Sequence, residues 1–305
     1  MAETTHGAVT RQLDETARTN RPAAYGSKAG GAARPMGPVH VTFTNLLRAE
    51  LYRLVRLPAF WLGLATVACV ALTAYALNLL VILADDTMAT AQAWIEPSNA
   101  GPFGFCPLVV GMVMVALVGA DERAGAIRSL AESGLRRAYV STTGAVLLLT
   151  TIAHIVVVES VLVAFPPIAN LPVRPVDPAV FMLGFAGMAL LVKALAALPL
   201  ALAIATGMER VGMFLAVVWG LMSPDAWLDG AFASVGEVAP ALADACEFMR
   251  AGLLTSVAEA LMSPANVLGN PADVARILLV PPGWLAAAGL FAHLSLRRWA
   301  LSAAA

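Results

Sequence analysis

The sequence predicts an all-α integral membrane protein. We expect six transmembrane helices, an N-terminal interfacial amphipathic helix, and an outer re-entrant or surface helix between the fifth and sixth spans. Of the 305 residues, 59% are hydrophobic and only 13% are charged, whereas soluble domains are about half apolar and about a quarter charged. The mean hydropathy is +0.78. Apolar runs near the roughly 20 residues that cross a bilayer recur along the chain. A soluble domain is excluded, because one core of this size cannot bury so much apolar surface.

Two regions divide the chain. Residues 1–40 contain glycine, proline and scattered charge but no apolar run. A secretory signal needs an apolar stretch of about 7–15 residues, so we interpret this region as a disordered cytoplasmic tail. Residues 41–305 are expected to form the six-helix transmembrane domain.

The interfacial helix is predicted over residues 41–57. Its apolar residues recur on one helical face. They are Phe43, Leu46, Leu47, Leu51, Leu54 and Val55, whereas Arg48, Glu50, Arg53 and Arg56 fall mainly off that stripe. A basic amphipathic helix directly before a span is typical of a helix that lies in the membrane interface.

The six spans are expected at about 59–84, 102–120, 138–165, 179–206, 211–222 and 274–296. Segment 211–222 is the shortest, because twelve residues make only about 18 Å of helix.

The distribution of lysine and arginine predicts the orientation. Fifteen of the 19 lie in the tail, the interfacial helix, the 121–137 loop, the 207–210 turn or the C-terminus. These segments fall on one side of a six-span topology. We therefore expect a multi-pass protein of the cell (plasma) membrane with cytoplasmic N- and C-termini.

The outer segment between the last two spans, 223–273, is long and acidic. Within it, apolar residues recur every three or four positions, which indicates an amphipathic helix. They are Leu242, Cys246, Met249, Leu253, Val257 and Leu261. We expect this helix to lie on the outer leaflet or to dip into it.

Catalytic and cofactor motifs are not found. The three cysteines have no CxxC spacing and the four histidines do not cluster, so no metal site is predicted. Neither lysine stands in a GxxxxGK[ST] loop, which excludes ATP binding by that route. We expect no enzymatic activity and no cofactor on this chain. The net charge of −1 gives no indication of a nucleic-acid partner.

Three ionisable residues fall within the spans: His154 and Glu159 in the third, and Lys193 in the fourth. Charge inside a membrane marks a functional site by default. The helical rise places Glu159 about 9 Å and Lys193 about 21 Å from the outer surface. A direct ion pair between them is therefore not expected. Glu159 should reach the outer interface or a cavity, and Lys193 should face the bundle interior. Structural roles stay open for all three.

The 121–137 loop carries the most informative pattern. It reads GADERAGAIRSLAESGLRRAYV from the end of the second span into the third. A solvated basic loop is one interpretation. In its order of Glu122, Gly125, Arg128, Leu130 and Arg137, however, the loop resembles the permease (transmembrane) subunits of ABC transporters of the type-2 exporter class. The resemblance covers about 41–300 and departs in one place, where Gly134-Leu135 replaces a proline.

This resemblance implies a partnership with other subunits. Such permeases dimerise, and each docks a separate P-loop subunit that binds and hydrolyses ATP with magnesium. The 121–137 loop then corresponds to the ATPase-coupling loop, and 41–57 to the interfacial elbow helix, with Leu47, Arg48, Leu51, Arg53 and Leu54 at its centre. Substrate would pass through the interface of a homo- or heterodimer, walled by the second and fifth helices. Exporter activity in a bacterial membrane is part of the same expectation, and the few polar residues in the spans favour a hydrophobic or amphipathic cargo.

Two other functions remain open. An ion-gradient-driven secondary transporter would use Glu159, His154 and Lys193, and would often show an internal repeat; none is evident. A membrane assembly protein that transports nothing is also compatible with six helices.

Overall fold

The computed structural model describes residues 42–84, 105–123, 125, 127, 135–168, 177–222, 224–261 and 270–303. Across these residues all regular secondary structure is helical, which confirms the all-α class. The tail predicted over 1–40 lies outside the described residues, as do Arg128 and Leu130.

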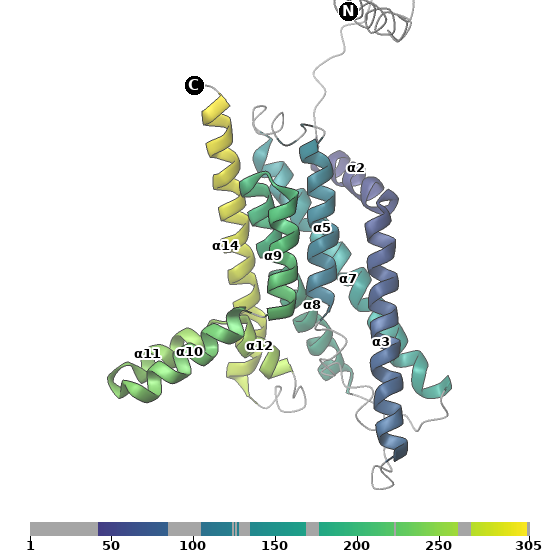
Figure 1. Ribbon diagram of the computed structural model, residues 1–305, viewed down its shortest axis with the longest axis vertical. Helices are drawn as coiled ribbons and strands as arrows, with labels where there is room; N and C mark the ends of the chain where they lie inside the picture. Colours follow the sequence, from purple (N-terminus) through teal and green to yellow (C-terminus); the bar gives the residue numbers. More distant parts are fainter. Residues whose placement is uncertain are drawn as a thin grey trace, which may run out of the picture. The chain divides into compact units, whose positions relative to one another are not determined.

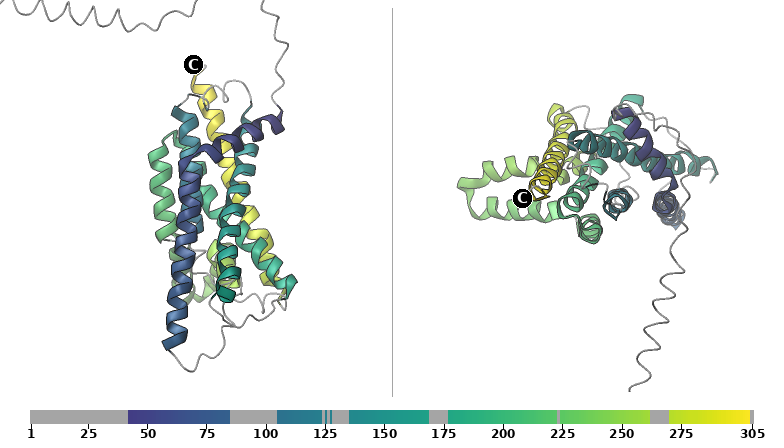
Figure 2. Two further views of the ribbon diagram at one scale, coloured as in Figure 1. Left: turned by 90° about the vertical axis from the view of Figure 1, so that its right-hand side faces the viewer. Right: turned by 90° about the horizontal axis from the view of Figure 1, so that it is seen from above.

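Long helices run alternately up and down the bundle (Figure 1). They are α3 (Pro58–Ala84), α5 (Cys106–Arg123), α7 (Arg136–Ile168), α8 (Pro178–Thr206), α9 (Glu209–Met222) and α14 (Pro271–Ala303). The short helix α2 (Phe43–Arg56) crosses one end of the bundle, where the C-terminus also lies. We call this the α2 end. Figure 2 shows α2 running across the bundle rather than along it.

Local signals explain where these helices begin and end. The side chain of Thr42 accepts a hydrogen bond from the backbone N–H of Asn45 and caps α2. Asp177 Oδ1 accepts the N–H of Ala179 at 2.8 Å, and Pro178 occupies the first turn of α8. Gly207, with a φ of 61°, ends α8 in the left-handed conformation that glycine favours.

The core lies along α5 and α8. Both helices are lined by fully buried side chains, such as Val110 and Met114 on α5 and Ala196 on α8. In contrast, α3 and α14 leave large apolar side chains exposed, including Leu77 and Leu279. A bundle whose outer helices are apolar outward is typical of a protein surrounded by lipid.

Four helices are long and apolar enough to cross a membrane, namely Pro58–Leu77, Arg136–Val161, Pro178–Thr206 and Pro271–Arg298. A fifth span is counted if the bent pair Glu209–Gly220 and Asp225–Val238 is taken together. Each of the six predicted spans coincides with a helix. However, α5 ends in the charged run Asp121-Glu122-Arg123, and α9 has only 14 residues. The described residues therefore show a multi-pass membrane protein with four to five candidate spans, and the sixth stays a prediction.

The segment between α9 and α14 differs from the single amphipathic helix that the sequence predicts. It forms α10 (Pro224–Val238), a 3-10 turn η2 (Pro240–Leu242), α11 (Ala243–Ala251) and α12 (Leu254–Leu261). Leu253, Val257 and Leu261 of the predicted stripe are buried against the protein, whereas Leu242 and Met249 are exposed. Helix α12 packs on α8 and α14, and α10 with α11 forms a hairpin that projects sideways from the bundle (Figure 1).

The packing of α9 depends on two glycines. A Cβ on Gly212 would lie 2.5 Å from Ala203 Cβ of α8, and one on Gly220 would lie 2.6 Å from Leu108 Cβ of α5. Small residues let helix backbones approach closely in membranes, where no hydrophobic effect drives helices together. This close approach holds the short α9 inside the bundle.

Candidate functional site

A charged cluster joins three helices at the α2 end. Arg53 of α2 forms ion pairs with Asp121 at the end of α5 and with Glu50 on its own helix, the latter at 3.0 Å. The hydroxyl of Tyr139 on α7 donates to Asp121 Oδ2 at 3.3 Å. Glu50, Asp121 and Tyr139 are all buried. We call these four residues the α2–α5–α7 cluster. It fixes α2 to the residue that begins the predicted coupling loop.

Because Glu50 and Asp121 are buried, their carboxyl groups stay ionised only with the help of the nearby positive charge of Arg53. Burial raises the pKa of Glu50 above its usual value, the nearby Asp121 carboxylate raises it further, and Arg53 offsets part of both effects. Burial likewise raises the pKa of Asp121, with Arg53 and the Tyr139 hydroxyl acting in the opposite direction. Two carboxylates in a poorly solvated site repel each other unless a cation lies between them. Arg53 is that cation.

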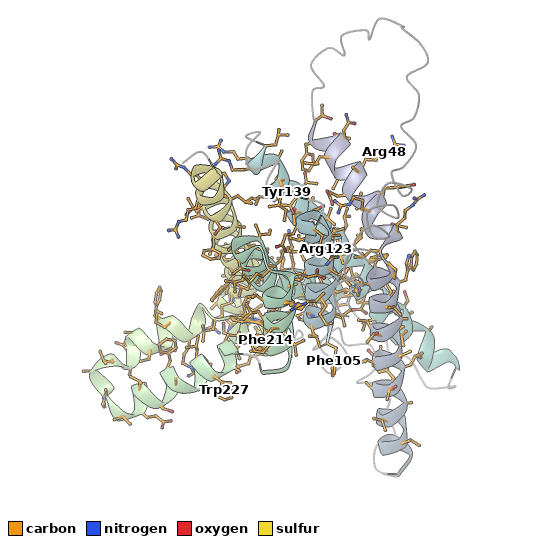
Figure 3. All side chains as sticks on the ribbon, turned by 45° about the horizontal axis from the view of Figure 1, so that its top comes forward. Arg48, Phe105, Arg123, Tyr139, Phe214 and Trp227 are labelled. Carbon is orange, nitrogen blue, oxygen red and sulfur yellow. The ribbon has the colours of Figure 1, made fainter. Side chains whose placement is uncertain are left out.

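A second ion pair joins α5 to α9 at the same end. Arg123, two residues beyond Asp121, pairs with Glu209 in the first turn of α9. The Glu209 side chain lies directly over Gly119, where a Cβ would collide with it. Figure 3 shows Arg48, Arg123 and Tyr139 toward the α2 end, whereas Phe105 and Trp227 lie toward the opposite end.

The described part of the 121–137 loop begins with a tight turn. Glu122 is half-buried in the last turn of α5, and its carbonyl accepts the N–H of Gly125 at 2.9 Å. Gly125 has a φ of 69°, in the left-handed region that only glycine adopts readily. Two residues later Ile127 is buried in the main apolar cluster. Arg137 is exposed at the start of α7. The loop therefore turns away from α5 at Gly125, and the buried Ile127 packs it against the bundle.

The predicted interfacial helix packs partly on the protein. Leu47, Leu51 and Leu54 of its apolar stripe contact the buried core, whereas Phe43 and Val55 are about half exposed. Arg48 is exposed, as the sequence predicts. The prediction that Glu50 and Arg53 point away from the stripe is wrong in effect, because both face the buried cluster with α5. The 3.6-residue period places Glu50 between Leu46 and Leu54, inside the apolar stripe, and Arg53 at its edge, so their positions on the helix are consistent with facing the protein.

Leu51→Asp is expected to detach α2 from the bundle, because it places an unpaired carboxylate among Leu47, Leu54 and the core. Hydrogen exchange of residues 43–56 in phosphatidylcholine nanodiscs should become faster by at least about tenfold, the equivalent of about 1.4 kcal/mol. Ala49→Asp, on the exposed face of the same helix, is the matched control. Unchanged exchange in Leu51→Asp would contradict the packed position of α2.

The three intramembrane ionisable residues do not come together. His154 on α7 is fully buried; its Nδ1 donates to the carbonyl of Thr150 at 2.8 Å, and its Nε2 has no hydrogen-bond partner. Glu159 is also buried, and neither carboxylate oxygen accepts a hydrogen bond. The prediction that Glu159 reaches the outer interface or a cavity stays a prediction. Among the described residues, no ion pair joins Glu159 to Lys193, as the depth arithmetic predicts.

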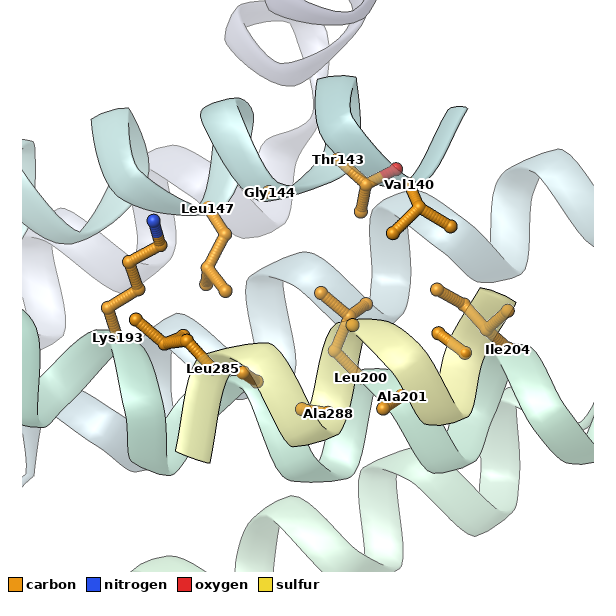
Figure 4. A pocket seen from close by; sticks show the side chains of 13 residues that line it. Val140, Thr143, Gly144, Leu147, Lys193, Leu200, Ala201, Ile204, Leu285 and Ala288 are labelled. Carbon is orange, nitrogen blue, oxygen red and sulfur yellow. The ribbon is translucent and has the colours of Figure 1, made fainter. Parts of the chain in front are cut away.

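Lys193 lines a cavity of about 230 Å³ between α7, α8 and α14 (Figure 4). The rest of the wall is almost wholly apolar. It is formed by Val140, Thr143, Gly144 and Leu147 on α7, by Ala197, Leu200, Ala201 and Ile204 on α8, and by Leu285, Ala288, Gly289 and Ala292 on α14.

Sequence reasoning missed several residues of these sites. Arg53, Tyr139 and Glu209 are single polar residues with partners that lie 68, 18 and 86 positions away in the chain. The charge at the end of α5 is visible in the sequence, but its partners are not. The described residues contain no group of histidine, cysteine, aspartate or glutamate that could hold a metal ion.

Comparisons of the chain with protein-family models, with characterised proteins and with solved structures find no match.

Proposed function

We propose that the chain is the membrane-spanning permease subunit of an ATP-driven exporter. It forms the translocation path as a dimer and is driven by a separate P-loop ATPase that docks on the 121–137 loop. The observation that carries this proposal is the charged network at the base of that loop: α5 ends there, and Asp121 and Arg123 tie it to α2, α7 and α9.

This network suits a subunit that receives mechanical work. A force applied to the loop is passed to the spans only if the loop's base is rigidly held by more than one helix. Asp121 contacts both α2 and α7, and Arg123 contacts α9. Displacing the loop therefore displaces four helices together. ATP and magnesium bind the partner subunit, and this chain supplies the membrane path.

The distribution of basic residues supports the proposed orientation, and exposed apolar side chains on α5 and α9 support the proposed dimer. The basic residues concentrated at the α2 end orient it toward the cytoplasm of the cell membrane, on the side where ATP is hydrolysed. The expected walls of the dimer interface are α5 and α9, which pack against each other and leave Met112, Phe214 and Val217 exposed. A second copy of the chain would cover these side chains.

The test is purification of the tagged chain in mild detergent, with and without ATP, followed by mass spectrometry and an ATPase assay. A stoichiometric P-loop protein is expected. Arg137→Glu should remove it, because Arg137 is exposed at the loop and reversing its charge adds repulsion to the docking surface. Arg298→Glu, an exposed arginine at the C-terminal end of α14, is the matched control. Recovery of the chain alone contradicts the permease function, and retention of the ATPase by Arg137→Glu contradicts the docking site.

Gly125 tests coupling separately from docking. Gly125→Val is expected to leave the protein inserted, because no atom lies within 4 Å of the added Cβ, but a β-branched residue is strained at a φ of 69°. The ATPase should remain bound while transport per ATP falls severalfold. Gly230→Val, at another open glycine on α10, is the control. Normal coupling in Gly125→Val contradicts the role of this turn.

An ion-gradient-driven transporter is the second candidate, because His154 Nε2 and both Glu159 oxygens are buried without hydrogen-bond partners. Buried ionisable groups of this kind occur in proton relays. Transport by the purified chain in vesicles, driven by a proton or sodium gradient without ATP and abolished by Glu159→Gln, would favour this function over the first.

A further inference from the structure

We propose that the cavity between α7, α8 and α14 is a binding site for an anionic amphipathic molecule, with its charged head at Lys193 and its apolar chain along the cavity wall. This inference names a cargo class, and as a cargo site it rests on the proposed transport function. Binding itself is a property of this chain alone.

The position of Lys193 requires a counter-charge. It lies near the middle of α8, about 20 Å from either end of that helix at 1.5 Å per residue, which is too far for its amine to reach either end of the helix. Among the described residues no carboxylate lies within ion-pair distance of it. An unpaired ammonium at this depth is costly, and such residues mark substrate pathways.

The rest of the cavity is suited to an alkyl chain. Thr143 is the one other lining residue with a polar side chain, and the remaining eleven are apolar or glycine. On α8 the lining extends from Lys193 to Ile204, which is about 16 Å of helix. Figure 4 shows the amine of Lys193 directed toward α7 at one end of the cavity, with Val140 and Ile204 at the other. An elongated molecule with one charged end fits this arrangement.

The size of the cavity limits the occupant to a single chain. Its volume of about 230 Å³ is below the roughly 300–1,000 Å³ of pockets that enclose drug-sized ligands. Gly144 and Gly289 face it from opposite helices, and a Cβ built on either would meet no atom within 4 Å. These two glycines keep the space open, and larger residues there would fill it without colliding with the protein.

The test uses the full chain, purified without its ATPase, in phosphatidylcholine nanodiscs. Dodecanoic acid is the probe; dodecanol has the same chain without charge, dodecyl phosphate carries a different anionic head, and inorganic phosphate has no chain. Dodecanoic acid and dodecyl phosphate should bind, and dodecanol should bind at least about tenfold more weakly, because its uncharged hydroxyl cannot form an ion pair with the Lys193 ammonium. Inorganic phosphate alone should not bind. A diazirine-bearing fatty acid should label peptides within 140–147, 193–204 and 285–292.

Two kinds of variant test the charge of Lys193 and the open volume of the cavity separately. Lys193→Met should weaken dodecanoic acid binding by about 10- to 100-fold, and Lys193→Arg should retain most of it. Gly289→Leu and Gly144→Leu should block binding with Lys193 intact. Gly283→Leu, at an open glycine of α14 that does not line the cavity, is the matched control. Equal binding of the alcohol, unchanged binding in Lys193→Met, or labelling elsewhere in the chain overturns the proposal. Because no ATPase is present, these outcomes are independent of the permease test.

Discussion

Replacing Arg53 by methionine is expected to release α2 from the bundle and to lower the stability of the protein. The substitution leaves Glu50 and Asp121, both buried, facing each other without the cation that pairs with both. Breaking a fully buried ion pair costs about 3–5 kcal/mol. Because the Arg53 side chain is 36% exposed, we expect a smaller loss of about 2–3 kcal/mol. Thermal unfolding in detergent, followed by size-exclusion chromatography, measures this loss.

The pH dependence of the Arg53→Met variant identifies the cause. Burial raises the pKa of both Glu50 and Asp121 in the folded protein, so the folded state binds protons more tightly than the unfolded state. Stability from such a group is present at low pH and is lost as pH rises through the folded-state pKa. The variant's deficit should therefore be smaller near about pH 5 than near about pH 8.

Two further variants control for loss of packing. In Arg53→Met with Asp121→Asn one of the two carboxylates is gone, so part of the stability should return. Arg48→Met removes an exposed arginine from the same helix and should change little. A deficit in Arg53→Met that is independent of pH and is not relieved by Asp121→Asn would contradict the cluster.

Gly212→Leu is expected to displace α9 from the bundle. A Cβ at this position already lies 2.5 Å from Ala203 and 2.9 Å from Val115, so a leucine side chain has no space between α8 and α5. Overpacking of this kind costs about 1–3 kcal/mol or more. Helix α9 has only 14 residues and packs on both α5 and α8, so a leucine at this position disturbs both of its interfaces. We expect a reduced yield of folded protein and a lower unfolding temperature in detergent.

Gly230→Leu is the matched control for Gly212→Leu. It makes the same change on α10, where a Cβ meets no atom within 4 Å. Equal stability of Gly212→Leu and Gly230→Leu would show that α9 is not held by close approach to α5 and α8.

Much of the helical framework is predictable from local sequence. The long apolar runs at 59–84, 138–165, 179–206 and 274–296 each contain or coincide with a helix long enough to span. Pro178 at the start of α8 and Gly207 at its end mark boundaries within a residue or two. A backbone in an apolar environment must satisfy its own hydrogen bonds, and a helix does so within a single segment. A long apolar segment is therefore expected to form a helix along its whole length.

The segment 224–261 shows where local pattern fails. The spacing of Leu242, Cys246 and Met249 predicts one amphipathic helix. The chain instead reverses at η2, so that α10 and α11 form a hairpin held by Asp229 and Arg250 at 2.8 Å and 3.0 Å. It breaks again at Gly252, before α12. Trp284 of α14 also donates a hydrogen bond to the carbonyl of Gly252 at 3.0 Å. These partners lie 21 and 32 residues away, so no window along the chain contains them.

The sequence by itself determined that this protein is helical, that it is a multi-pass membrane protein, and that its charge is concentrated in alternate connections, because hydropathy and charge act residue by residue. Only the tertiary structure decided which polar groups are brought together. It placed Arg53 between Glu50 and Asp121, left Glu159 buried, and put Lys193 into an apolar cavity. The physical reason is that ion pairs and cavities form between helices distant in sequence, and their positions depend on how closely those helices pack.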